Sequence, residues 1–114
     1  MCFFEKNDIL IWVNLEGYEG RLMLRLQLDG KGNYNDYLTI ERAVGGTKGT
    51  EVLFILTFKY IRDLYYMPSN SGGPYKICID LPDGDPRLMN ILVEKHCFNY
   101  FAFRKIMKTY QKNR

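Results

Sequence analysis

Hydrophobic and polar positions alternate along most of this 114-residue chain, in short stretches separated by turn-forming residues. The clearest stretch is 21–28, where four leucines occupy every second position and mainly polar residues occupy the others. A period of two is typical of a strand that buries one face. We expect the other face, with Arg21 and Arg25, to lie in water. An earlier stretch, 8–15, is apolar on both faces, as in a strand covered on each side.

Five further strands are expected from the same pattern and from the glycine, asparagine and proline clusters between them. The β-branched and aromatic run 51–67 is too long for one strand, so we divide it near Phe58 or Lys59. Near the end of the chain, the turn 83–86 predicts a hairpin, whose second strand Pro86 places toward a sheet edge. The predicted strands are 8–15, 21–28, 37–44, 51–58, 59–67, 75–82 and 87–94.

The period changes at residues 97–111, which predict one amphipathic helix. On a helical wheel, apolar side chains gather on one half and basic side chains on the other. Phe101 lies among the basic residues, and Lys105 lies near the boundary. The ordinary explanation of the basic half is a solvated surface that complements the helix dipole. The apolar half contains Phe98, Ala102, Phe103, Ile106, Met107 and Tyr110, and the polar half contains Arg104, Lys108, Gln111 and Lys112.

Seven short antiparallel strands and one C-terminal helix predict a mainly β fold: a sandwich or partly open barrel whose open end the helix covers. The length fits a single domain, 1–114, with its core at about 8–112. This order resembles the pleckstrin homology superfold, most of all in the last hairpin and the helix with Phe98, Phe101 and Tyr110 that follows it. The resemblance covers 8–111 and lies in element order, not in a diagnostic motif.

The resemblance allows the first turn of this chain to be compared with that of members that bind phosphoinositides. Members that bind phosphoinositides carry basic residues on this turn and on the strand ends that flank it. The corresponding turn here, 15–20, carries Glu16 and Glu19, and the nearest basic residues are Arg21 and Arg25. Carboxylates repel a phosphorylated headgroup, so we expect this site to be degenerate. Many other members bind proteins, either by peptide addition to a sheet edge or through surfaces near the helix.

The chain also resembles the inner membrane complex sub-compartment proteins of apicomplexan parasites, which are small pleckstrin homology folds without a good headgroup site. Their anchoring depends on an N-terminal glycine and on cysteines, and of these the present chain has only Cys2. Cys2 could accept a palmitoyl group, although the glycine that myristoylation requires is missing.

The composition argues against a membrane-spanning, secreted, metal-binding or catalytic protein. No apolar run approaches the roughly 18 residues needed to span a bilayer, and no secretory signal is visible, so we expect an intracellular protein, cytoplasmic or peripheral to a membrane. The net charge of +3 is mild. We expect no metal, because the only histidine, His96, adjoins Cys97 instead of lying at ligand spacing from it. We also expect no cofactor and no enzyme activity, because His96 is the sole candidate base and cannot face its immediate neighbour Cys97 in a helix. The glycine-rich stretch 45–50 matches no phosphate-binding spacing.

Two functions stay open. The first is a non-catalytic protein-interaction or scaffolding module, suggested by the fold and by tyrosines such as Tyr65 and Tyr66 that could be exposed. The second is a binder of anionic lipid or, less favoured, single-stranded nucleic acid. Basic residues can contact the phosphates of a nucleic-acid backbone, and aromatic residues interleaved with them can stack on the bases. The candidate residues of the second function are Arg21, Arg25, Phe101, Arg104, Lys105, Lys108 and Lys112, with Tyr100 beside them.

Overall fold

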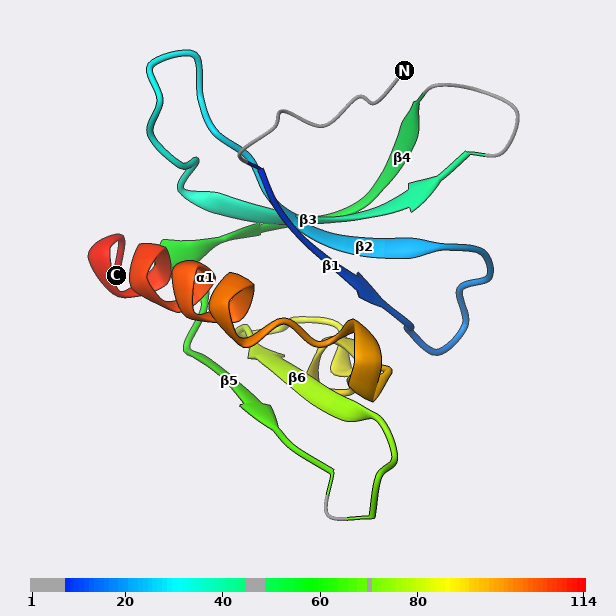
Figure 1. Ribbon diagram of the computed structural model, residues 1–114. Helices are drawn as coiled ribbons and strands as arrows, with labels where there is room; N and C mark the ends of the chain where they lie inside the picture. The colour runs from blue at the N-terminus through cyan, green and yellow to red at the C-terminus, as the bar shows by residue number, and fades with distance from the viewer. Residues whose placement is uncertain (1–7, 45–48, 70) are drawn as a thin grey trace.

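Seven antiparallel strands in two sheets and one C-terminal helix make up the computed structural model, which describes residues 8–44, 49–69 and 71–114 (Figure 1). The predicted mainly β fold class is therefore confirmed. Cys2 and the glycine-rich residues 45–48 lie outside the described residues. The four-stranded sheet has the order β1 (Ile9–Val13), β2 (Leu22–Leu26), β3 (Tyr37–Ala43) and β4 (Thr50–Thr57). The three-stranded sheet has the order β5 (Asp63–Met67), β6 (Tyr75–Asp80) and β7 (Ile91–Val93).

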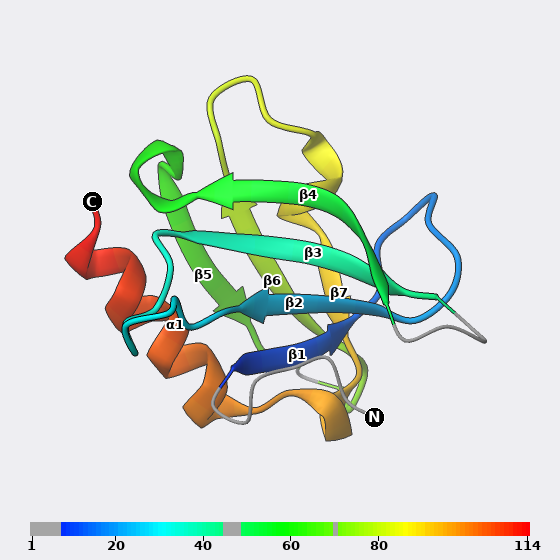
Figure 2. The same cartoon turned by 90° about the horizontal axis from the view of Figure 1, so that it is seen from above.

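The two sheets lie face to face and enclose one hydrophobic core (Figure 2). Leu24 and Ile40 of the first sheet and Ile77 and Ile91 of the second are all fully buried. The sheets also meet through their backbones, because the N–H of Asn14, just after β1, donates to the carbonyl of Leu92 in β7 (2.7 Å). The helix α1 (Tyr100–Lys112) packs against β1 and covers one open side of this sandwich.

The helix begins three residues later than predicted, at Tyr100 instead of Cys97. The side-chain Oδ1 of Asn99 accepts a hydrogen bond from the N–H of Ala102 (3.1 Å), so Asn99 is the N-cap. A separate 3-10 helix, Lys95–Cys97, precedes it. This cap fixes where the helical register starts, and therefore which side chains face the core.

The predicted apolar half of the helix faces the core as expected, although Phe98 lies before α1 and, like Met107, is only half-buried. Phe103, Ile106 and Tyr110 are at most 3% exposed. Thr109 on the same side of the helix is buried as well, and its hydroxyl donates to the carbonyl of Lys105 (3.0 Å). A polar residue is therefore tolerated there because its own helix satisfies it.

The strand predicted at 87–94 is much shorter than expected. Only Ile91–Val93 forms a strand, and the tight turn predicted at 83–86 is part of a ten-residue connection, 81–90. A 3-10 helix, Pro86–Met89, occupies its second half. Asp85 caps this helix and Pro86 begins it, which takes the chain out of the sheet.

The division of the long β run is confirmed at the expected place. β4 ends at Thr57, and a 3-10 helix, Phe58–Tyr60, turns the chain between the sheets. β5 starts only at Asp63, four residues after the predicted boundary. Within the described residues, no helix is both long and apolar enough to cross a membrane.

Candidate functional site

An aromatic cluster joins α1 to the second sheet. Tyr66 of β5 is at its centre, with ring centroids 4.8 Å from Phe98 and 5.2 Å from Phe103. Tyr75 of β6 stacks on Phe98 at 4.7 Å, and Tyr100 meets the edge of Tyr66 at 6.5 Å. Tilted, edge-on and offset contacts of this kind are the favoured arrangements of aromatic rings. The cluster therefore sets the position of the helix relative to β5.

A surface hollow of about 320 Å³ opens above this cluster, between β5 and α1. Its floor is apolar, and it has one cation on its wall. The side chains of Tyr65 and Tyr66 come from the strand, and the other lining residues come from one face of the helix. The helix contributes Tyr100, Phe103, Arg104 and Met107.

The hollow lies beside a strand edge. β5 is the outermost strand of its sheet, and among the described residues its backbone pairs with β6 only. Its side chains alternate, with Leu64 buried and Tyr65 and Met67 exposed at 36% and 47%. A hydrogen bond with the Cys78 side chain raises the pKa of Tyr65 above its ordinary value. The edge thus offers backbone donors and acceptors next to an apolar recess.

A second strand edge belongs to β4, the outermost strand of the first sheet. Val52 and Ile55 are 51% and 66% exposed on it. A register irregularity between Ile40 and Glu41 of the neighbouring strand interrupts the β3–β4 pairing. Such irregularities blunt an edge against further pairing.

The outward face of α1 is basic and has exposed aromatic side chains in its first turn. Phe101 is 73% exposed, and Tyr100 next to it is 50% exposed. Residues 100–114 contain five basic and no acidic side chains, so with a net charge of +3 overall the preceding 99 residues sum to −2. The positive charge of this protein is therefore concentrated on its last helix. The basic residues of this segment are Arg104, Lys105, Lys108, Lys112 and Arg114.

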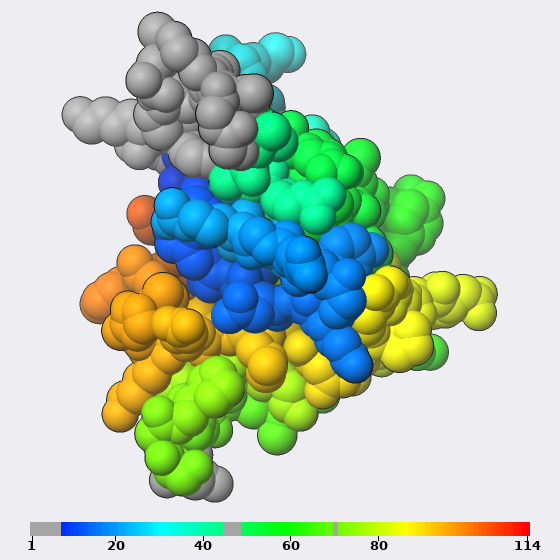
Figure 3. Space-filling view, turned by 90° about the vertical axis from the view of Figure 1, so that its right-hand side faces the viewer, coloured from blue at the N-terminus to red at the C-terminus, as the bar shows by residue number. Residues whose placement is uncertain are grey.

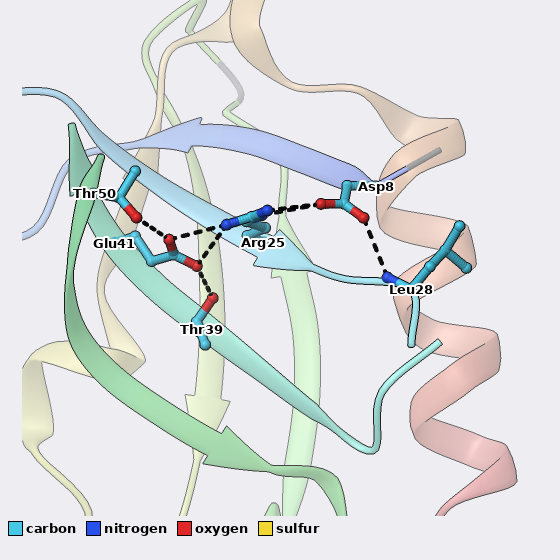
Figure 4. A network of polar contacts seen from close by, with 6 residues as sticks. All are labelled: Asp8, Arg25, Leu28, Thr39, Glu41 and Thr50. Atoms are coloured by element: carbon cyan, nitrogen blue, oxygen red, sulfur yellow. Dashed lines mark hydrogen bonds and ion pairs between the residues drawn. The ribbon is translucent and has the colours of Figure 1, made fainter. Parts of the chain in front are cut away.

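Arg25, predicted to be exposed and to join this surface, is buried instead (Figure 4). Its guanidinium lies 2.9 Å from Asp8 Oδ2 and 3.2 Å from Glu41 Oε1. Both carboxylate side chains are only 1% exposed. Hydroxyl groups of Thr39 and Thr50 also contact Glu41. The face of β2 that was expected to be wet is therefore closed by a polar network across four strands, and Arg25 is unavailable to a ligand.

Arg21 is exposed but lies apart from the basic face of α1. Its guanidinium stacks over the Trp12 ring at 4.2 Å. It lines a different hollow, of about 210 Å³, together with Glu94 and Cys97. The predicted set is thus divided: the helix residues share one face, while Arg21 lies elsewhere and Arg25 is buried.

The first turn, 15–20, which the resemblance suggested as the place of a headgroup site, is packed against the 81–90 connection (Figure 3). Arg87 Nη1 donates to the Glu16 carbonyl (3.3 Å), and the Arg87 guanidinium lies 4.9 Å from the Tyr18 ring. Arg87 also forms an ion pair with Asp85, in which Arg87 Nη2 lies 2.6 Å from Asp85 Oδ2. Its side-chain and backbone hydrogen bonds lower the pKa of Asp85 to about 2. Gly17 has a φ of +85°, and a side chain there would meet Arg87 at 2.7 Å. Arg87, which contacts this turn, is therefore already engaged.

One group of described residues brings metal-ligand atoms together, contrary to the spacing argument made for His96 and Cys97. Glu94, His96 and Cys97 present ligand atoms that all lie within 4.8 Å of one another. The 3-10 helix Lys95–Cys97 curls the chain so that sequence neighbours converge.

No family model, curated protein or solved structure matches this chain significantly. The sequence indicated the basic helix face correctly. It missed the hollow, whose two walls come from segments more than 30 residues apart, although the tyrosine pair at 65–66 was a signal for it.

Proposed function

We propose that this chain is a pleckstrin homology-like protein-interaction module that receives an extended peptide along the free edge of β5, next to α1. The fold assignment is supported by the order of four strands, three strands and a closing helix. The observation that carries the binding proposal is the apolar hollow of about 320 Å³ immediately beside an unpaired strand edge.

Recognition at such a site combines two kinds of contact. A peptide strand added to β5 gains main-chain hydrogen bonds, and every second side chain can enter a recess beside the edge. Burying one leucine or phenylalanine side chain contributes about 1.5–3 kcal/mol. Arg104 on the wall favours a peptide with an acidic residue near this apolar anchor. We therefore expect a partner segment that is extended, apolar at one position and acidic close to it.

The rigidity of the floor supports this role. Tyr66 and Phe103 belong to the aromatic cluster and are held by several ring contacts each. A recess that already has its bound shape loses little conformational entropy when a ligand enters.

Peptides selected from a random-sequence display library on the intact chain test the proposal. We expect Arg104→Glu to weaken their binding about tenfold or more, which corresponds to about 1.4 kcal/mol. Lys112→Glu makes the same charge change on the same helix outside the hollow, and should change the affinity less than about twofold. Fluorescence anisotropy of labelled peptides measures both.

Hydrogen exchange locates the bound peptide. The amides of β5 should become protected when peptide is added, and binding should respond only slightly to salt. Protection confined to the edge of β4, or equal losses in Arg104→Glu and Lys112→Glu, would contradict the assignment to this groove.

A second candidate function is peripheral binding to an anionic membrane through the outward face of α1. It is favoured by one observation: Phe101, in the first turn of α1, is 73% exposed, and every charged residue of this helix is basic. An exposed ring can enter the headgroup region while lysine and arginine meet anionic lipid. Each basic residue near such a surface contributes about 1 kcal/mol, or about fivefold in affinity. The engaged Arg87 and the exposed Glu16 and Glu19 make the first turn the less suitable surface.

Co-sedimentation with vesicles separates this candidate from the first. Vesicles that contain phosphatidylserine should bind the chain at low salt, and pure phosphatidylcholine vesicles should not. Arg104→Glu and Lys112→Glu should weaken this binding to a similar extent, and Phe101→Ala should weaken it further. An oligothymidylate that binds more tightly than the vesicles, with the same dependence on Phe101, would assign this face to single-stranded nucleic acid instead.

A further inference from the structure

Three different kinds of metal ligand, a carboxylate, an imidazole and a thiol, lie close together in the segment that joins β7 to α1. Glu94 Oε2 and His96 Nε2 are 3.2 Å apart, and these two groups and the Cys97 sulfur all lie within 4.8 Å of one another. Their side chains belong to the short 3-10 helix Lys95–Cys97 and to the residue that caps it. We propose that Glu94, His96 and Cys97 form a three-ligand binding site for a zinc-type divalent cation.

The distances fit such an ion. Zinc binds oxygen, nitrogen and sulfur at about 2.0–2.3 Å in tetrahedral geometry, which places neighbouring ligand atoms about 3.3–3.7 Å apart. The Glu94–His96 separation of 3.2 Å is already close to this value. The remaining pairs need only side-chain rotation, because Glu94 and His96 are 57% and 78% exposed and not held by core packing.

The donor set selects the class of metal. One thiolate, one imidazole and one carboxylate suit zinc or cobalt, whereas magnesium and calcium require oxygen ligands throughout. When the metal binds, the Cys97 thiol gives its proton to the solvent and the sulfur forms the metal bond. The thiolate and the carboxylate then carry two negative charges, which balance a divalent cation.

The surroundings leave room for a fourth ligand. Glu94 and His96 line a surface hollow of about 440 Å³ with Asn14 and Leu92, so water can complete the coordination. The nearby cations are Lys95 and Arg21, and Arg21 is stacked over Trp12 at 4.2 Å. A bound ion would hold together the segment that joins β7 to α1.

A cobalt titration of the reduced full-length chain tests the proposal. We expect one equivalent of Co²⁺ to give the visible absorption of a tetrahedral site together with a sulfur-to-cobalt charge-transfer band, and Zn²⁺ to remove both. Cys97→Ser should abolish the charge-transfer band. His96→Ala and Glu94→Gln should each weaken binding at least about tenfold, since loss of an outer-shell partner alone costs that much.

Cys2→Ser is the matched control, because it removes a thiol to which the proposal gives no role. It should leave the spectrum and the affinity unchanged. His96 is exposed, so His96→Ala keeps the test valid even where Cys97→Ser perturbs the fold. The proposal is overturned by the absence of a charge-transfer band, by its persistence in Cys97→Ser, or by its loss in Cys2→Ser.

Discussion

The buried network around Arg25 leads to a sharp prediction about stability. Arg25→Met removes the guanidinium that lies 2.9 Å from Asp8 and 3.2 Å from Glu41. The methionine fills most of the space, but two carboxylates whose side chains are each 1% exposed lose their ion pair with Arg25. Among the described residues, no buried polar side-chain atom lacks a hydrogen-bond partner, so the change breaks a completed network.

The expected cost is about 3–5 kcal/mol, the range for removing one partner of a buried ion pair. That is a large part of the roughly 5–15 kcal/mol that stabilises an ordinary domain. Arg42→Met is the matched control, because Arg42 also pairs with a glutamate across neighbouring strands, with Arg42 Nη2 2.6 Å from Glu51 Oε2. Those two side chains are 33% and 52% exposed, so we expect a cost below about 1 kcal/mol.

Urea unfolding measures both costs. The fluorescence of Trp12, the single tryptophan, reports on β1, and circular dichroism reports on the whole fold. Equal slopes with shifted midpoints would show a change in stability alone. If Arg25→Met abolishes folding, Arg25→Lys, which keeps the charge but loses the fork of donors, should give an intermediate value. Equal costs for Arg25→Met and Arg42→Met would refute the reasoning.

Three further predictions concern local contacts. Tyr110→Phe should destabilise the protein by about 1 kcal/mol in urea unfolding, because the tyrosine hydroxyl donates to the buried carbonyl of Ile61 (3.1 Å). Asn99→Ala should cost about 1 kcal/mol through loss of the helix cap, with lower helix content by circular dichroism at raised temperature, and Asn99→Asp should restore most of it. Asp85→Asn should destabilise the protein less as the pH falls. Arg87 lowers the pKa of Asp85 in the folded state to about 2, below the ordinary 3.8. The ionised Asp85 carboxylate therefore stabilises the fold fully above pH 3.8, and this contribution is lost as the pH falls toward 2. Unfolding midpoints of wild type and Asp85→Asn that stay equally far apart across this pH range would contradict that linkage.

Local patterns were sufficient for most elements. Alternating leucines placed β2, the helical wheel placed the buried face of α1, and the position of Phe58 marked the break between the sheets. The sequence also contains local signals for the two boundaries that were predicted wrongly, the start of α1 and the start of the last strand. Asn99 stands where a helix cap is favoured, and Asp85 followed by Pro86 is typical of a helical start and not of a strand.

The candidate sites depended on the tertiary structure. A strand residue such as Arg25 is exposed or buried according to its neighbours across the sheet, and its partners Asp8 and Glu41 are 17 and 16 residues away. The hollow beside β5 forms because Tyr66 of the strand meets Phe103 of the helix. No periodicity along the chain contains that pairing.

The sequence by itself determined the class of fold, the buried side of α1 and the concentration of positive charge on its outer side, because hydrophobic period and charge are properties of a short segment. The tertiary structure alone decided that Arg25 is internal, that β5 has a free edge beside an apolar recess, and that Glu94, His96 and Cys97 converge. Those outcomes depend on which strands pair and on how a 3-10 helix turns the chain, and both are settled only when the core packs.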